Sequence, residues 1–133
     1  MNKQYKFTIP GTLPGLNEYI NAERGNRYHA ANIKKQTEDM IAACIAQQLR
    51  GVRFDGPVKI TYTWYEENRK RDKDNIAFAK KFIQDALVAT GVLENDGWQE
   101  IVSFSDEFRV DKSNPRVEVV IESIEKGGEW ASD

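Results

Sequence analysis

The sequence holds one cysteine and one histidine among its 133 residues. A single cysteine excludes an internal disulfide and cysteine-based zinc clusters, and a single histidine excludes the two-histidine H-E-x-x-H zinc motif. Any metal ion that this chain binds must therefore be held mainly by oxygen ligands, which is the coordination chemistry of Mg²⁺ and Mn²⁺. We expect Cys44 to pack in the core.

Long apolar runs and an excess of positive charge are lacking as well. No stretch approaches the length of a membrane span, and no signal-peptide pattern is present, so we expect an intracellular protein without a membrane partner. The 19 basic and 21 acidic residues give a formal net charge of −2, so no global basic field points to a nucleic acid. The length suits one domain that buries its own core.

The apolar periodicity predicts a small α/β (α+β) domain with a mixed sheet and two main helices. Residues 5–9 and 58–65 alternate apolar and polar side chains, and 101–110 and 117–124 are also typical of strands. Residues 31–50 and 75–90 have helical spacing, and a long loop from Pro10 through Tyr28 follows the first strand. The predicted order is β-α-β-α-β-β over residues 1–125, followed by a flexible tail at 126–133.

We expect each helix to bury one stripe of apolar side chains. The expected stripe of the first helix is Ile33, Met40, Ile41, Cys44, Ile45 and Leu49. The expected stripe of the second helix is Ile76, Ala79, Phe82, Ile83, Ala86 and Leu87.

The stretch "RKRDKDN", residues 69–75, places two acids inside a basic run, and six cations against two acids give residues 69–81 a local charge of +4. Asp72 and Asp74 would project to one side of an extended backbone and repel each other unless a cation lies between them. In the structural interpretation, that cation is a neighbouring lysine or arginine side chain. In the functional interpretation, it is a metal ion. An EF-hand needs glycine where this chain has Ala77, and a sugar-nucleotide D-x-D site normally needs a much larger fold.

Two further charged residues can extend this site. In a continuous helix Lys81 lies about 20° around the axis from Asp74, whereas Lys80 lies about 120° away. Lys81 can also pair with Asp85 four residues on, and an ammonium group stabilises charge in phosphoryl transfer. A solvated surface lysine remains the alternative. Asp96, in a loop before a predicted strand, is either a further acid of the site or ordinary Asp-Gly turn chemistry.

The segments "RDKDN", "KKFIQDAL" and "GVLENDGWQEI", in this order, resemble the RusA family of Holliday junction resolvases, and the upstream "IPGTLPGLNEY" is similar to the family's proline-rich entry. The similarity runs over nearly the whole chain. It implies a RusA-like fold and a homodimer. It further implies a Mg²⁺-dependent endodeoxyribonuclease that cuts four-way DNA junctions by paired symmetric nicks in recombination and repair.

The resemblance also implies roles for individual residues. Asp72, Asp74 and Asp96 are the implied metal ligands, and Lys81 is the implied catalytic lysine. The helix between Asn75 and Asp85 is about one turn longer than the family pattern, so Lys80 is the alternative. The chain also departs from the family by having Asn95 before Asp96, where two adjacent acids are common, and an extra residue before Gln99.

Two groups of side chains are candidate DNA contacts, and Trp98 is either a core residue or faces DNA. The early loop supplies Asn17, Tyr19, Arg24 and Arg27, and the basic run supplies Arg69, Lys70, Arg71, Lys73 and Lys80. A catalytically silent branched-DNA-binding module and a metal-stabilised interaction protein are the rival hypotheses. From the family we expect a bacterial cytoplasmic or nucleoid location and a phage or prophage origin.

The reach of the chain predicts how the three acids meet. A straight helix over residues 75–90 spans about 24 Å, and the five residues 91–95 cover at most about 18 Å. Asp96 therefore does not easily return to Asp74 in its own chain. We predict a site shared across a two-fold dimer with antiparallel helices, and a shorter or bent helix is the competing explanation.

Overall fold

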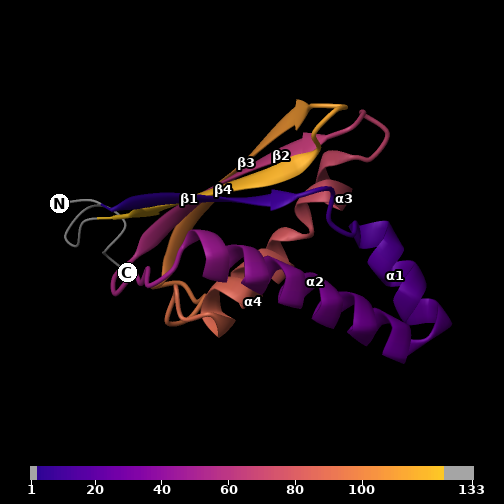
Figure 1. Cartoon of the computed structure of the whole chain (residues 1–133). Helices are drawn as coiled ribbons and strands as arrows, with labels where there is room; N and C mark the ends of the chain where they lie inside the picture. The colour runs from indigo at the N-terminus through magenta and orange to yellow at the C-terminus, as the bar shows by residue number, and fades with distance from the viewer. Residues whose placement is uncertain (1–2, 125–133) are drawn as a thin grey trace.

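The computed structural model describes residues 3–124 (Figure 1). The strands are β1 (Gln4–Pro10), β2 (Val58–Glu66), β3 (Ile101–Val110) and β4 (Arg116–Ser123). The helices are α1 (Leu16–Gly25), α2 (Arg27–Gln48), α3 (Lys73–Ala77) and α4 (Lys80–Ala89). The predicted mixed α/β class is confirmed, and the predicted tail at 126–133 lies outside the described residues.

The four strands form one mixed sheet in the order β1-β4-β2-β3. β4 is antiparallel to both β1 and β2, whereas β3 is parallel to β2. Parallel neighbours need a crossover connection, and here the chain from β2 to β3 passes through α3 and α4. The helices lie against one face of the sheet in Figure 1. The start of α3 therefore follows the end of β2, while the loop after α4 leads back to the start of β3.

The core lies between this face of the sheet and the helices. In β2 the side chains of Val58, Ile60, Tyr62 and Trp64 are buried and alternate with half-buried ones. The predicted buried stripe of residues 76–87 is confirmed at all six positions. The stripe of α2 is confirmed for Ile41, Ile45 and Leu49. Along residues 3–124 no helix has the length and apolar character to cross a membrane.

Other positions of the α2 stripe differ from the prediction. Met40 is exposed, and Cys44 packs at the edge of the core only half-buried. Met40 lies about 100° around the axis from Ile41, which puts it on the flank of the helix.

The predicted loop from Pro10 through Tyr28 is wrong over most of its length, because it contains α1 and the first residues of α2. Within it, regular structure is absent from Gly11 to Gly15 and at Asn26. Asn26 separates the two helices and begins α2 four residues earlier than predicted, because its side chain accepts a hydrogen bond of 2.8 Å from the Tyr28 N–H. The breakers Pro10, Gly11, Pro14 and Gly15 therefore end one strand and precede a helix.

The single helix predicted over residues 75–90 is divided into α3 and α4 at Phe78 and Ala79. The backbone bonds at the division connect residues three apart, as in Lys81 N–H to Phe78 O at 3.2 Å and Phe82 N–H to Ala79 O at 3.0 Å. This spacing is that of a 3₁₀ turn, which rotates the chain by about 120° per residue instead of 100°. The predicted 20° offset between Asp74 and Lys81 therefore does not hold.

We expect Ile83→Ala, at a side chain with 0% exposure, to lower the free energy of unfolding by about 2–5 kcal/mol, because it removes buried methylenes and leaves a cavity. The matched control is Met40→Ala in α2, which should cost less than about 1 kcal/mol. Urea unfolding followed by circular dichroism measures both. Equal losses would contradict the assignment of Met40 to the surface.

Candidate active site

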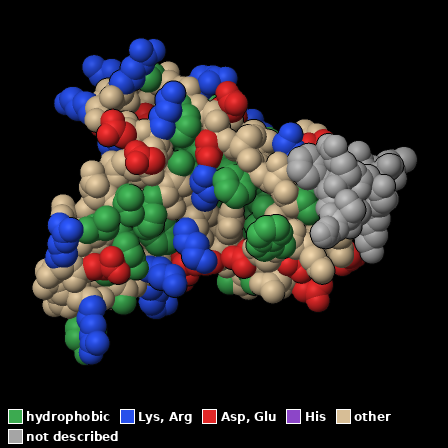
Figure 2. Space-filling view, turned by 180° about the vertical axis from the view of Figure 1, so that it is seen from behind, with side chains coloured by type: hydrophobic (Ala, Val, Ile, Leu, Met, Phe, Trp, Pro, Cys, Tyr) green, Lys and Arg blue, Asp and Glu red, His purple; other side chains and the backbone are tan. Residues whose placement is uncertain are grey.

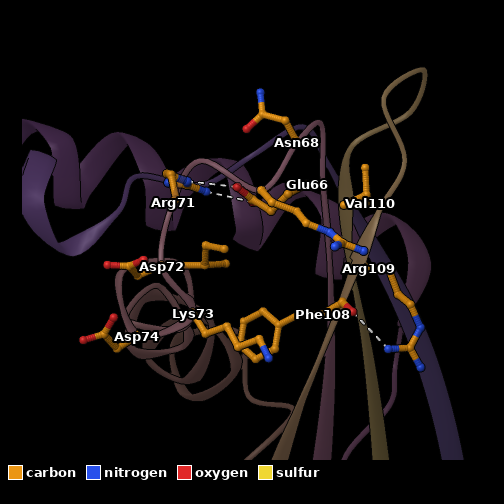
Figure 3. Close-up of a pocket in the computed structure, with 11 residues that line it drawn as sticks. Glu66, Asn68, Arg71, Asp72, Lys73, Asp74, Phe108, Arg109 and Val110 are labelled. Atoms are coloured by element: carbon orange, nitrogen blue, oxygen red, sulfur yellow. Dashed lines mark hydrogen bonds and ion pairs between the residues drawn. The ribbon is translucent and has the colours of Figure 1, made fainter.

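Asp72 and Asp74 lie where the chain enters α3. Asp72 has extended backbone angles at the N-cap position, makes no capping hydrogen bond with its side chain, and is followed by Lys73 in the first turn. The Asp74 carboxylate accepts a hydrogen bond of 2.9 Å from the Asn75 N–H. Both acids are exposed, and Figure 3 shows their carboxylate groups pointing to the same side, away from the strand that carries Phe108.

These two acids belong to a pocket of about 780 Å³ at the carboxyl ends of β2 and β3. Its other lining groups include the basic side chains of Arg69, Lys73 and Arg109. The ammonium group of Lys73 lies 5.6 Å from the centre of the Phe108 ring. The pocket thus combines two carboxylates with a basic and partly aromatic rim, which is a suitable environment for a phosphate chain with a metal ion.

The first constraint on the carboxylates is an ion pair between Arg71 and Glu66. Arg71 Nε donates to Glu66 Oε1 at 2.9 Å, and Arg71 Nη2 donates to Glu66 Oε2 at 2.8 Å. Glu66 is buried at the end of β2, with 9% exposure. Arg71 Nη1 also donates to the Leu13 carbonyl at 3.0 Å. The bidentate ion pair therefore connects the sheet to the residue before Asp72, and the bond to Leu13 connects both to the segment before α1.

A second constraint comes from a close approach at Gly15. The Asn75 Oδ1 atom accepts a hydrogen bond of 2.9 Å from the Asn17 N–H. A Cβ atom at Gly15 would lie 2.7 Å from that same oxygen and 2.9 Å from Arg71 Nη1. Glycine is needed here for space. The segment before α1 therefore packs directly on both ends of the turn that carries the carboxylates.

Lys80 and Lys81 have different surroundings. Lys80 is half-buried, with its ammonium group bonded to the Asp106 carboxylate and 4.4 Å from the centre of the Phe104 ring. Asp106 also accepts a hydrogen bond of 2.9 Å from the Trp64 indole. Lys80 is therefore held against the sheet.

Lys81 is exposed and pairs with Asp85 at 3.1 Å, as its spacing predicts. This hydrogen bond raises the pKa of Lys81, and the charges of Asp85, Asp96 and Glu38 add to the effect. Lys81 therefore remains protonated at neutral pH, where it supplies a positive charge and does not accept a proton.

Asp96 is half-buried in a turn before β3. The turn is ordered by hydrogen bonds from the Gly97 N–H to the Glu100 side chain at 3.0 Å and from the Ile101 N–H to the Gly97 carbonyl at 3.0 Å. Within residues 3–124, no three His, Cys, Asp or Glu side chains come together in a group that could hold a metal ion. One chain therefore brings Asp72 and Asp74 together but does not add Asp96 to them.

The candidate DNA contacts separate into exposed and internal side chains. Tyr19 packs against Phe78 and Phe82, with ring centres 5.6 Å and 5.9 Å apart, so its ring is used within the protein. Arg71 and Lys80 are likewise engaged internally. The exposed candidates are Asn17, Arg24, Arg27, Arg69, Lys70 and Lys73.

Sequence reasoning missed Arg109, which lines the pocket from β3. It missed Glu66 as well. Glu66 continues the buried alternation of β2, so a charge at a core position was the available signal. Trp98 is not a core residue, because it is 96% exposed.

We expect Gly15→Ala to lower the free energy of unfolding by about 1–3 kcal/mol, because the new methyl group would overlap Asn75 and Arg71. Gly25→Ala is the matched control, since nothing lies within 4 Å of its added Cβ. That control should be neutral or stabilising by up to about 1 kcal/mol at the end of α1. Thermal unfolding measures the stability of both variants. A Gly15→Ala protein with unchanged stability would contradict the close packing at Gly15.

Comparison with models of known protein families gives a match. The family model described as endodeoxyribonuclease RusA matches residues 10–122, which include all the candidate site residues. A search of curated proteins finds no match.

Proposed function

Because the chain belongs to the RusA family of endodeoxyribonucleases, we propose that it is a metal-dependent, structure-selective nuclease that resolves Holliday junctions. It hydrolyses phosphodiester bonds by paired symmetric nicks, in DNA recombination and repair. The observation that carries the proposal is the pair of exposed carboxylates, Asp72 and Asp74, on a pocket with a basic rim.

The residues present fit a divalent cation. Among the ion pairs of residues 3–124, none involves Asp72, Asp74 or Asp96. Three of the basic side chains close to them in sequence already have other acids, since Arg71 pairs with Glu66, and Lys80 and Lys81 pair with Asp106 and Asp85. Two neighbouring carboxylates thus lack the lysine or arginine partner that the structural interpretation requires. All-oxygen ligands suit Mg²⁺, with Mn²⁺ as the alternative.

When bound, the ion supplies an activated water and neutralises the scissile phosphate for in-line attack. Asp72 and Asp74, which line the pocket, would hold it. Arg69, Lys70, Lys73 and Arg109 bind the phosphates on either side and orient the strand without reading its sequence. Lys81, which is protonated, stabilises the negative charge of the transition state. The expected products are a 5′-phosphate and a 3′-hydroxyl.

We place Asp96 in the site of a second subunit. The homodimer is implied by the family, and the support from geometry is that one chain does not group Asp96 with the other two acids. The competing explanation, a bent helix, is present in the structure as the break at Phe78 and Ala79. Even with this break between α3 and α4, Asp96 does not join Asp72 and Asp74 in one group within the described chain.

The rival is a catalytically silent module that binds branched DNA. It is favoured by Asn95, which stands where the family commonly has an acid, and by the lack of a three-carboxylate group in one described chain. Cleavage of a synthetic junction in Mg²⁺ or Mn²⁺, compared with binding in EDTA, separates the two functions. Binding without any nicks would favour the module.

We predict that Asp72→Asn, Asp74→Asn and Asp96→Asn each lower the cleavage rate by about a hundredfold or more, because each removes a metal ligand. Junction binding should persist or tighten, since one negative charge near phosphate is lost. The control is Asp39→Asn on α2, whose carboxylate pairs with Lys35 at the surface. Normal turnover by Asp96→Asn would remove that residue from the site.

Lys81→Ala should lower the rate at saturating DNA by about a hundredfold, as expected when a charge that stabilises the transition state is removed. Lys80→Ala should mainly lower the melting temperature, because it frees Asp106 from its partner. Turnover and thermal unfolding of both variants provide the comparison. A larger loss of rate for Lys80→Ala would identify Lys80 as the catalytic lysine.

Mixing inactive Asp74→Asn with inactive Asp96→Asn protein tests the shared site. If the site is shared, the mixed dimer has one centre with all three carboxylates and one centre that lacks both Asp74 and Asp96. Up to about half of the dimers formed should be mixed, so single nicks in the junction should reappear. A mixture that remains inactive while subunit exchange is demonstrated would place each site within one chain.

A further inference from the structure

A second group of charged side chains lies where α2 packs against α4. It consists of Glu38 on α2 and of Lys81 and Asp85 on α4, and none of these three lines the pocket of Asp72 and Asp74. Lys81 Nζ donates a hydrogen bond of 3.1 Å to Asp85 Oδ1. The Asp85 carboxylate is also hydrogen-bonded to the Glu38 carboxyl group. A contact between two helices therefore continues the pair that holds Lys81.

The bond between Glu38 and Asp85 needs a proton. Two ionised carboxylates cannot hydrogen-bond to each other, because both only accept. Asp85 already accepts a bond from Lys81, which favours its ionised form. Glu38 Oε2, in contrast, is buried and has no hydrogen-bond partner among residues 3–124. An ionised oxygen without water or a donor is costly, so the proton belongs to Glu38.

The surroundings of Glu38 act on its pKa in the same direction. Burial raises the pKa of Glu38, and the charge of Asp85 and the hydrogen bond to it raise it further. Lys34, one turn earlier on α2, and Lys81 oppose this rise without cancelling it. Figure 2 shows charged groups of both signs close together on the side turned away in Figure 1. Water screens such surface charges, but it does not reach Glu38 Oε2.

We propose that Glu38 is a positioning residue of the nuclease, which donates a hydrogen bond from α2 to the Asp85 carboxylate and thereby fixes the acid that holds Lys81. The inference rests on the proposed function in one respect, namely that Lys81 stabilises the transition state. Glu38 itself does not touch the substrate in this role. It acts through Asp85.

Lys81 needs such an anchor because its own contacts are weak. Its side chain is 62% exposed, whereas that of Asp85 is 22% exposed. An exposed pair of residues four apart on a helix contributes little and leaves a long lysine side chain with several rotamers. The charges of Asp96 and Glu38 also attract Lys81. A proton on Glu38 removes one of these competing charges and leaves Asp85 as the fixed partner.

The positioning depends on pH in one direction. Because the pKa of Glu38 is raised, the proton remains at pH values at which an ordinary glutamate has lost it. The bond to Asp85 is present below the raised pKa and is lost as the pH rises through it. Above that pKa, Glu38 is a second carboxylate that repels Asp85 and attracts Lys81.

Two substitutions at Glu38 test the role. Glu38→Met keeps the length of the side chain but has no donor, whereas Glu38→Gln keeps an N–H donor at every pH. At the low end of the pH range in which the wild type cuts a synthetic junction, Glu38→Met should lower kcat about tenfold with KM unchanged. Glu38→Gln should remain within about twofold of the wild type. Equal losses in both variants, or an unchanged kcat of Glu38→Met, would overturn the proposal.

The control is Asp39→Asn, which neutralises the neighbouring acid on α2, where it pairs with Lys35 at the surface. It should leave kcat unchanged at every pH. The ratio of the kcat of Glu38→Gln to that of the wild type should rise severalfold with pH, because only the wild type loses its donor. A ratio that is constant, or one that Asp39→Asn reproduces, would overturn the proposal.

An Asp85→Asn background shows whether Glu38 acts through Asp85. There, the further change Glu38→Met should alter kcat by less than about twofold, because residues that act in one chain of contacts are not additive. A second tenfold loss would mean that Glu38 acts independently of Asp85 and would overturn the positioning role.

Thermal unfolding as a function of pH reports on the carboxyl pair without any nuclease assay. The unfolded chain releases the Glu38 proton at a lower pH than the folded protein, so the wild type should lose stability relative to Glu38→Gln as the pH rises above the ordinary pKa of glutamate. An active nuclease that shows no such loss would overturn the pair and leave the proposed function intact. This loss in a protein that cuts no junction in Mg²⁺ or Mn²⁺ would confirm the pair but overturn the proposed function, and with it the positioning role.

Discussion

The bond between Glu66 and Arg71 is the interaction on which the site depends. A buried carboxylate at the end of a central strand is costly unless a well-placed cation compensates it, and Arg71 does so with two hydrogen bonds below 3.0 Å. The same guanidinium group reaches the Leu13 carbonyl. The end of β2 and the segment before α1, which are far apart in sequence, are thereby fixed beside Asp72. An exposed turn of charged residues, which would otherwise sample many conformations, is held in one.

The charged side chains around the pocket differ in whether they have an ion-pair partner. Three of the cations near the carboxylates in sequence, namely Arg71, Lys80 and Lys81, are each paired with an acid. Asp72 and Asp74 form none of the ion pairs of residues 3–124, and Lys73 and Arg109 line the same pocket. This division suits a substrate that brings both a metal-binding phosphate and a long negative backbone.

The crossover from β2 to β3 explains why one chain does not form a complete ligand set. Because the two strands are parallel, the helices between them must carry the chain from one end of the sheet to the other. Asp72 and Asp74 come at the beginning of this path, and Asp96 comes at its end. A site shared between two subunits, as proposed above, would bring the beginning of this path in one subunit beside its end in the other.

The sequence by itself determined the mixed fold, the family and the buried side of residues 76–87, since apolar periodicity reports directly on which face of an element leaves water. It also indicated the Lys81–Asp85 pair, because that contact is local. It did not predict α1, whose apolar positions are few and follow several breakers, or the 3₁₀ turn at Phe78 and Ala79, which accompanies aromatic packing against Tyr19. Only the tertiary structure decided that Arg71 and Lys80 face acids of the protein and that Trp98 faces solvent. Residues that look equivalent in a charged run acquire different roles when strands and helices bring distant partners within 3 Å, and such partners leave no local pattern in the sequence.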